Sequence, residues 1–404
     1  MKTILAFSGG LDTTYCAIYL CRELGHEVHA VTVNTGGFTI QEIKDIESHA
    51  LKLGVKSYTC LDERKSYYEK IIRHLVFGNV LKNNTYPLSV SAERFIQAMA
   101  IAEFAVKNNA DAVAHGSTGA GNDQVRFDMV FQIMAPELKI ITPIRDMQLS
   151  REAEISYLRQ HGVEMNFEKA AYSINKGLWG TSVGGRETLG SKEPLPDDAW
   201  PSPLSKESTE TISLEFKKGE LYGINDHSYE HPVDAILALE QLASPYAIGR
   251  DIHVGDTIIG IKGRVGFEAA APLIIIKAHH LLEKHVLTKW QLYWKDQLAA
   301  FYGNWLHEGQ FLDPVMRDME SFMTGMQAHV SGQVFLQLHP YRFTLNGIES
   351  PYDLMSSKFG SYGEINRAWS GDDVKGFAKI FGNQIAIYEQ VRHAAEIKKL
   401  NDHD

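Results

Sequence analysis

Cysteine is scarce in this chain of 404 residues, which contains only three, Cys16, Cys21 and Cys60. They form no Cys-x-x-Cys pair, and their spacing matches none of the patterns that bind zinc. A disulfide framework and a zinc centre are therefore not expected. We expect the three thiols to pack as small apolar side chains, which suits a protein of the reducing cytosol.

Long apolar runs and an excess of positive charge are also missing. No run approaches the roughly 20 apolar residues that cross a membrane, and the chain opens on a predicted strand rather than on a secretory leader. We therefore expect a cytoplasmic protein without a membrane partner. The formal net charge is −10. Because proteins that bind nucleic acid need basic surfaces against its phosphates, we expect no nucleic-acid partner.

The length and the order of the apolar patterns predict more than one domain. Hydrophobic residues make up 44% of the 404 positions, and a chain of this length exceeds what one core usually holds. Strand-like patterns at 2–7, 27–33, 57–60, 112–115 and 140–144 alternate with helix-like patterns such as 40–53 and 94–108. The alternation predicts an α/β fold with a doubly wound parallel sheet, in which ligands bind beyond the carboxyl ends of the strands.

The first strand end carries the sequence Ser8-Gly9-Gly10-Leu11-Asp12-Thr13-Thr14. A Ser-Gly-Gly turn lets backbone N–H groups converge without obstruction from Cβ atoms, and the following helix adds the positive end of its dipole. The pattern predicts a phosphate-binding loop, although Ser-Gly-Gly alone is also compatible with an ordinary turn. The ending of a Walker A loop is missing. Asp12 would repel phosphate unless a cation lay between them, which predicts Mg²⁺.

A second polar motif follows the strand predicted at 112–115. It reads HGSTGAGNDQVRF over residues 115–127 and combines three glycines with amide, carboxylate and guanidinium side chains. Glycines permit close approach of the backbone to a ligand, Asp123 is suited to hold an amine, and Arg126 is suited to pair with a carboxylate. The alternative is a turn rich in Asn and Asp.

These two motifs resemble those of a known family. SGGLDT is similar to the loop of the N-type ATP pyrophosphatases, whose fold is Rossmann-like, and residues 115–127 resemble the HGxTGxGNDQVRF motif of argininosuccinate synthase. The resemblance covers most of the chain and implies an ATP-dependent ligase of arginine biosynthesis. In that reaction the ureido oxygen of citrulline attacks the α-phosphorus of MgATP and pyrophosphate leaves. The aspartate amine then displaces AMP to give argininosuccinate.

The resemblance also implies which residues form the site. It implies ATP binding by Ala6, Phe7, Ser8, Gly9, Gly10, Leu11, Asp12, Thr13, Thr14, Val33 and Gly116, and aspartate binding by Thr118, Asn122 and Asp123. For citrulline it implies Tyr86, Ser91, Asn122, Arg126, Ser173 and Ser182. Asp12, which would face Mg²⁺ through the pyrophosphate, and Arg126, as a carboxylate clamp, are the residues whose loss should harm catalysis most.

Four positions depart from the family pattern. Ala120 stands where many relatives carry Lys, and Gly184 and Phe267 stand where relatives usually carry Glu and Tyr. Gly255 aligns with a citrulline-binding Glu, unless the alignment slips by one residue and Asp256 takes that place. Because the missing carboxylates would meet the α-amine of citrulline, an N-acetyl- or N-succinylcitrulline is an alternative substrate. The main hypothesis remains an ordinary citrulline site, in which these residues have changed without a change of substrate.

The rest of the chain predicts the remaining organisation. We expect a nucleotide-binding domain over residues 1–165, an α+β synthetase domain over 166–369, and a C-terminal oligomerisation helix over 370–404, with apolar residues at helical spacing. The family implies a homotetramer. A module that only binds ATP is the lesser functional alternative. The pair His279-His280 lacks metal-binding partners nearby in sequence and is predicted to lie at an exposed strand end.

Overall fold

The computed structural model describes residues 1–163, 172–356 and 368–401. The chain divides into two compact units, Met1–Tyr352 and Asp353–Asp404, which are treated separately here. The boundary predicted at residue 165 falls outside the described residues and stays a prediction. Of the helices in the described ranges, none has both the length and the apolarity needed to cross a membrane.

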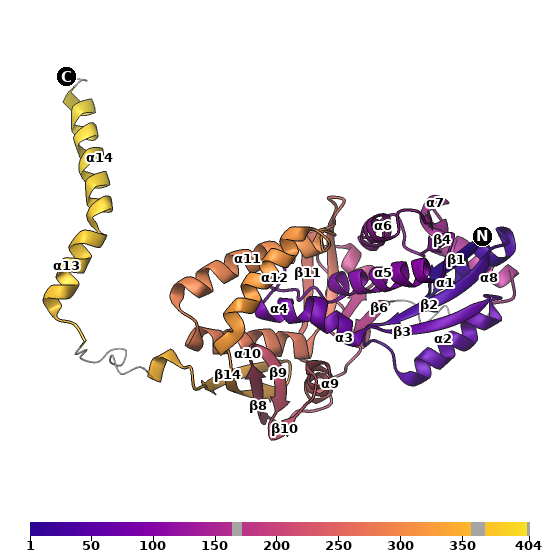
Figure 1. The fold of residues 1–404 in the computed structure, drawn as a ribbon, viewed down its shortest axis with the longest axis horizontal. Helices are drawn as coiled ribbons and strands as arrows, with labels where there is room; N and C mark the ends of the chain where they lie inside the picture. The colour runs from indigo at the N-terminus through magenta and orange to yellow at the C-terminus, as the bar shows by residue number, and fades with distance from the viewer. Residues whose placement is uncertain (164–171, 357–367, 402–404) are drawn as a thin grey trace. The chain divides into compact units, whose positions relative to one another are not determined.

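A five-stranded parallel sheet forms the N-terminal part of the first unit (Figure 1). Its strands are β1 (Lys2–Ala6), β2 (Glu27–Asn34), β3 (Ser57–Asp62), β4 (Ala112–Ala114) and β5 (Lys139–Ile141), in the order β3-β2-β1-β4-β5. Neighbouring side chains of β1 enter different cores: Ile4 joins the core that contains Phe95, and Leu5 joins the core that contains Tyr15. Both faces of the sheet are therefore covered, which confirms the predicted doubly wound α/β fold.

Eight α-helices lie in sequence between and after these strands within residues 1–163, besides π-helical stretches at Tyr19–Glu23 and Tyr68–Ile72. They are α1 (Leu11–Ile18), α2 (Ile40–Lys52), α3 (Arg64–Tyr67), α4 (Arg73–Phe77), α5 (Ser89–Lys107), α6 (Asp123–Met134), α7 (Pro143–Asp146) and α8 (Arg151–Gln160). The strand predicted at 140–144 is too long, because Pro143 begins α7. Proline lacks the N–H that a continuing strand would use and suits the first turn of a helix.

The following residues build two further sheets. β6 (Ser173–Gly177), β7 (Gly180–Gly184), β11 (Arg250–Asp256) and β12 (Lys262–Glu268) form one in the order β11-β12-β7-β6. β8 (Glu210–Lys217), β9 (Glu220–Ile224), β10 (His227–Ser228), β13 (Gly332–His339) and β14 (Arg342–Glu349) form the other. With α9 (Pro232–Ala243), α10 (Ala270–Val286), α11 (Lys289–His307) and α12 (Pro314–Met326), they confirm the predicted α+β character of this region.

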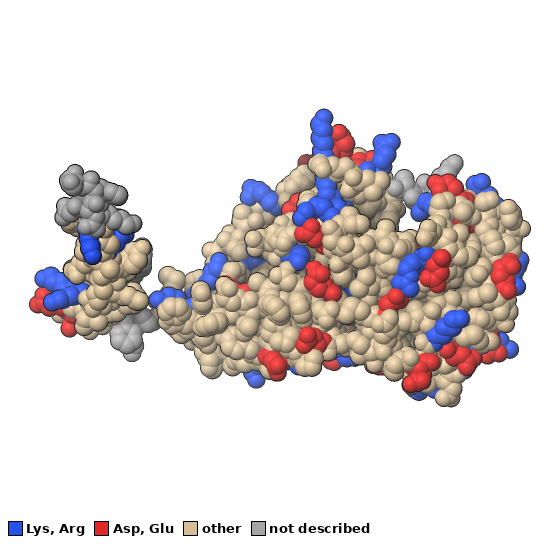
Figure 2. Space-filling view, turned by 90° about the horizontal axis from the view of Figure 1, so that it is seen from above, with Lys and Arg blue, Asp and Glu red and all other residues tan. Residues whose placement is uncertain are grey.

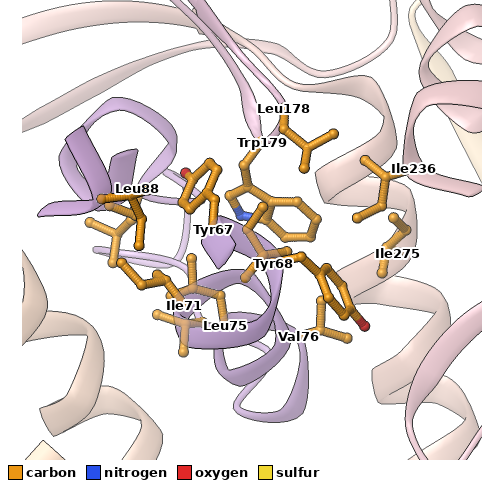
Figure 3. Packing of buried hydrophobic residues seen from close by; sticks show 14 of the residues in the cluster. Tyr67, Tyr68, Ile71, Leu75, Val76, Leu88, Leu178, Trp179, Ile236 and Ile275 are labelled. Atoms are coloured by element: carbon orange, nitrogen blue, oxygen red, sulfur yellow. The ribbon is translucent and has the colours of Figure 1, made fainter. Parts of the chain in front are cut away.

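One hydrophobic core joins the two parts of this unit (Figure 3). Trp179, in the turn between β6 and β7, is fully buried and packs among Tyr67, Leu88 and Ile236. Its indole Nε1 donates to the carbonyl oxygen of Pro87 over 3.1 Å, so the buried polar atom is satisfied. The β6–β7 hairpin is thus fixed against the start of α5, and this contact positions the residues described below.

The prediction for His279-His280 was wrong. These residues lie within α10, and His279 is fully buried. Its ring nitrogens lie 2.7 Å from Oδ1 of Asn79 and 2.9 Å from Oε1 of Gln327. The prediction took the apolar run before the pair for a strand, whereas the run lies in a buried helix. Periodicity alone does not distinguish a buried strand from a buried helix when the apolar run is short.

The described residues of the second unit include two α-helices. α13 (Gly371–Phe381) begins with a capping box in which Ser370 and Asp373 exchange hydrogen bonds, as the sequence pattern predicts. α14 (Asn383–Asn401) follows after Gly382, so the predicted single helix is two helices. Apolar residues of both helices are exposed within this chain: Val374, Phe377, Ile380, Phe381, Ile385 and Tyr388.

Candidate active site

The loop between β1 and α1 is arranged to receive an anion. Gly9 has a φ of 76°, in the left-handed region that glycine adopts without strain. Gly10 is the N-cap of α1 and supplies no side-chain cap, so the first amide groups of the helix keep their donors. Oγ1 of Thr13 donates to the carbonyl oxygen of Gly10 over 3.2 Å and lies 3.3 Å from Oγ of Ser8. These contacts between residues 8 and 13 hold the loop in a compact turn.

Asp12 lies in the first turn of α1 and faces a second carboxyl group. Burial raises the pKa of Asp12, whereas the neighbouring carboxyl group of Glu154 on α8 lowers it. Burial and the nearby Asp12 raise the pKa of Glu154 to about 8. Oε2 of Glu154 is buried and has no hydrogen-bond partner among the described residues. Two facing carboxyl groups, one with an unpaired oxygen, provide the donors that Mg²⁺ prefers.

Glu154 was missed by the sequence reasoning, because nothing near residue 154 indicates a contact with residue 12. The described residues contain no group of three or more His, Cys, Asp or Glu that would bind a metal unaided. A cation near Asp12 would therefore need further oxygen ligands from the phosphates that it accompanies, as is usual for Mg²⁺.

The loop after β4 approaches the phosphate-binding loop closely. A Cβ atom on Gly116 would lie 3.1 Å from the Cβ atom and the carbonyl carbon of Asp12. Glycine is therefore the residue that fits between the two loops without displacement. The neighbouring His115 is held by Asp128 of α6, since its Nε2 lies 2.9 Å from Oδ1 of that residue. The structure thus brings together two of the sequence motifs.

Asp123, predicted to bind aspartate, lies between two arginines. Nε of Arg94 donates to its Oδ2 over 2.8 Å, and a guanidinium nitrogen of Arg126 lies 3.4 Å from its Oδ1. Burial would raise the pKa of Asp123, but the two arginines hold it below its ordinary value. Asp123 is therefore a carboxylate whose position is fixed. Arg94 was missed by sequence reasoning, although it lies one helical turn after Ser91 on α5.

Arg126 is almost completely buried, with 2% of its surface exposed. One guanidinium nitrogen donates to the carbonyl oxygen of His307 over 2.9 Å, whereas its Nε has no hydrogen-bond partner among the described residues. Burial lowers the pKa of Arg126. A buried guanidinium with a free donor is a favourable partner for the carboxylate of a ligand.

The residues predicted to bind citrulline occupy neighbouring elements. Tyr86 is buried before α5, and its hydroxyl accepts from the backbone N–H of Val90 over 3.1 Å. Ser91 is buried in the first turn of α5. Ser182 of β7 is paired in register with Phe267 of β12, whose ring centroid lies 5.3 Å from that of Tyr86.

The remaining predicted positions are connected through the hairpin and the loops. Ser173 opens β6, and the carboxamide of Asn175 on the same strand accepts from Arg94 over 3.0 Å. Oδ1 of Asn122 accepts from the backbone N–H of Ile258, which ties the β11–β12 turn to the second motif. Thr118 and Ala120 lie in the exposed part of that motif, and no side-chain hydrogen bond of Thr118 links it to the other predicted residues in the described structure.

Comparison with known proteins agrees with these motifs. Residues 2–164 match the family profile described as "Arginosuccinate synthase N-terminal HUP domain", and residues 172–388 match "Arginosuccinate synthase C-terminal domain". The chain is 35% identical to argininosuccinate synthase of Methanocaldococcus jannaschii, over 96% of this chain and 97% of the relative. It is 34% identical to the enzyme of the same name from Xylella fastidiosa, over 97% and 98%. It is 32% identical to argininosuccinate synthase of Sulfurisphaera tokodaii, over 97% of this chain and 100% of the relative.

Proposed function

Because the chain belongs to the argininosuccinate synthase family, we propose that it joins citrulline to aspartate with ATP and releases AMP and pyrophosphate. The observation that carries this proposal is the meeting of two motifs: Gly116, in the second motif, lies against Asp12 of the phosphate-binding loop. A phosphate site and a site with fixed charges for amino acids thus adjoin. This is the arrangement that activation of an amino acid by ATP needs.

ATP is proposed to bind with its phosphates on the loop that runs from Ala6 to Thr14, near Val33 and Gly116. The unobstructed amide groups after Gly10 and the dipole of α1 support this placement. We assign Mg²⁺ to the side of the pyrophosphate that faces Asp12, with Glu154 as the neighbouring carboxyl group. When bound, Mg²⁺ neutralises charge on the leaving pyrophosphate.

The two amino acids are proposed to bind around the second motif. The free Nε donor of Arg126 is directed to the carboxylate of citrulline, together with Tyr86, Ser91, Asn122, Ser173 and Ser182. Asp123, held ionised by Arg94, is directed to the aspartate amine, together with Thr118 and Asn122. A carboxylate fixed by two guanidinium groups keeps one orientation without help from the substrate.

The chemistry then follows in two displacements. The ureido oxygen of citrulline forms a bond to the α-phosphorus while the bond to pyrophosphate breaks. The aspartate nitrogen next bonds to the activated ureido carbon, and AMP leaves with the former ureido oxygen. The aspartate nitrogen releases two of its three ammonium protons to solvent and keeps one N–H. Positioning and charge stabilisation supply most of the acceleration in such reactions. We assign no general base.

Free citrulline is the substrate we propose first, and N-acylcitrulline is the alternative. The alternative is supported by Gly184 and Gly255, which place no carboxylate near the substrate end. Arg186, whose side chain is 93% exposed and makes only a 3.7 Å ion pair with Glu187, is the cation we assign to an acidic acyl group. A homotetramer is also proposed. The exposed apolar side chains of α13 and α14 support association, since such a stripe is normally covered.

The proposed function is tested by pyrophosphate release from MgATP and aspartate. Citrulline, N-acetylcitrulline and N-succinylcitrulline are supplied in separate reactions, each with the wild-type chain and with Asp12→Ala. We expect release with free citrulline, and a large loss in the variant. Release with an acylated form alone would replace the substrate, and release with none of the three would refute the synthetase function. Light scattering of the full chain tests the tetramer.

A further inference from the structure

His253 occupies an unusual place beside the proposed citrulline site. It lies on β11, and its ring stacks on Tyr86 with centroids 5.1 Å apart and an interplanar angle of 27°. Only 6% of its surface is exposed. Tyr86 in turn lies against Phe267, and it neighbours Arg126 closely enough to raise the pKa of that arginine, against the dominant effect of burial. His253 therefore packs on a residue that is proposed to bind citrulline.

Gly255 makes room for this imidazole. Residues 253 and 255 lie on the same face of β11, since side chains alternate along a strand. A Cβ atom on Gly255 would lie only 2.5 Å from Nε2 of His253 and 3.1 Å from Cε1. The imidazole thus fills the space that a side chain at position 255 would take. The polar group at this point of the site comes from residue 253.

The imidazole has an unused polar atom. Nδ1 of His253 is buried and has no hydrogen-bond partner among the described side chains and backbone groups. Burial and the nearby Lys82 lower the pKa of His253, which favours the neutral ring. A neutral imidazole has one donor and one acceptor nitrogen. Leaving such an atom unpaired in a buried position is unfavourable unless a ligand pairs with it.

We propose that His253 is a substrate-binding residue that contacts the α-nitrogen of citrulline through Nδ1. This inference rests on the proposed function, because it takes citrulline as the ligand near Arg126. The carboxylate and the α-nitrogen of citrulline share one carbon atom, so a nitrogen partner must lie close to the carboxylate clamp. His253 stacks on Tyr86, which is itself one of the residues proposed to bind citrulline, and the β11–β12 turn is tied to Asn122 by the bond from Ile258.

The contact explains how a site without an acidic residue at positions 184 and 255 would hold citrulline. A neutral acceptor pairs with an ammonium group or with the N–H of an acylated nitrogen. It pairs more strongly with the charged form, because charge-assisted hydrogen bonds are the stronger ones. His253 therefore influences which form of citrulline is preferred.

The experiment measures KM and kcat for pyrophosphate release by the full chain carrying His253→Phe or His253→Asn. Phe keeps the stacked ring and removes both nitrogens, whereas Asn keeps a polar atom near the position of Nδ1. We expect His253→Phe to raise the KM for citrulline by roughly 10- to 100-fold, and the KM for N-acetylcitrulline, where that form is used, by roughly 3- to 10-fold. His253→Asn should recover part of the loss, and the KM for ATP and for aspartate should stay within about two-fold.

A matched control is His227→Phe, since His227 also contacts a tyrosine, Tyr229, but is exposed in β10. It should leave all three KM values unchanged. Gly255→Ala supplies a second test, because its Cβ atom would displace the imidazole and should raise the citrulline KM selectively. An unchanged citrulline KM in His253→Phe, or an equal rise for all three substrates, would overturn the inference. A wild-type chain that releases no pyrophosphate would instead refute the proposed function.

Discussion

Arg94 of α5 donates a hydrogen bond of 2.8 Å from Nε to Oδ2 of Asp123, the first residue of α6. The same guanidinium reaches Glu93, Gln97 and Asn175. One side chain, 12% exposed, thus connects the proposed aspartate-binding carboxylate with the hairpin that carries Ser173. A planar group with several donors in a fixed arrangement is needed for this, and the ammonium of a lysine does not replace it.

Replacing Arg94 with Lys should therefore weaken both the fold and the use of aspartate. Lysine keeps the charge but loses the planar donors that reach several partners at once, so we expect a cost of about 2 kcal/mol of unfolding free energy. The KM for aspartate should rise more than the KM for ATP, since Asp123 loses its main support. Urea unfolding and initial-rate kinetics measure the two effects.

Arg64→Lys is the control for this prediction. Arg64 pairs with Asp62 on the surface, with side chains 40% and 54% exposed. Exposed pairs of this kind contribute about 1 kcal/mol or less. If the two variants lost equal stability, the account of Arg94 as a central connecting residue would be wrong.

Arg126→Lys should impair citrulline use without unfolding the protein. Lysine keeps the charge but loses the planar donors that reach His307, Asp123 and the proposed substrate carboxylate. We expect kcat/KM for citrulline to fall roughly 10- to 100-fold. Arg73→Lys, which affects a pair with Glu220 outside the proposed site, should leave this ratio unchanged. Equal kinetics for both variants would argue against the clamp.

Gly177→Ala should reveal how tightly the β6–β7 hairpin packs on α5. A Cβ atom at this position would overlap Oε2 of Glu93. We expect a loss of about 2 kcal/mol in unfolding free energy, and a clearly smaller loss when Glu93→Ala is already present. Gly263→Ala, whose Cβ atom would meet no heavy atom within 4 Å, is the control. Additive effects of the Gly177 and Glu93 changes would contradict the contact.

The carboxyl group of Glu93 should make stability depend on pH. Burial raises its pKa from 4.5 to about 7, although Arg94 opposes the shift. Between these values the folded state holds a proton that the unfolded state has released, so the unfolding free energy falls as pH rises through this window. Glu93→Gln removes this proton uptake. From pH 5 to pH 8, its unfolding free energy should increase by about 2 kcal/mol relative to wild type, as measured by urea titration. A constant difference would contradict the shift.

Local sequence patterns predicted the fold where local rules decide it. Alternating patterns identified the parallel sheet, and the C-terminal helix predicted from residue 370 begins there, with Ser370 as the N-cap of α13. The same rules failed at Pro143, where a short helix follows the strand, and at His279, where a buried helix resembles a strand in composition.

The proposed site also contains residues that a local sequence pattern predicts and residues that it does not. The phosphate-binding loop is one continuous segment, so its sequence predicts its chemistry. Glu154, Arg94 and His253 reach the site through contacts with residues far along the chain, and no local pattern marks them. The glycine at 255 was recognised as a departure, but only the structure shows that the imidazole of residue 253 fills its space.

On the surface, charged groups of both signs are interspersed over the face shown in Figure 2. This distribution accompanies the net charge of −10 and offers no basis for a nucleic-acid partner on that face.

The central claim is that citrulline is activated through its ureido oxygen. It is tested most directly by giving the enzyme MgATP, aspartate and citrulline labelled with ¹⁸O in the ureido group, and measuring the mass of the AMP that forms. The account predicts one ¹⁸O atom in each AMP, because the ureido oxygen leaves with the phosphate. Unlabelled AMP, or ADP in place of AMP, would contradict it.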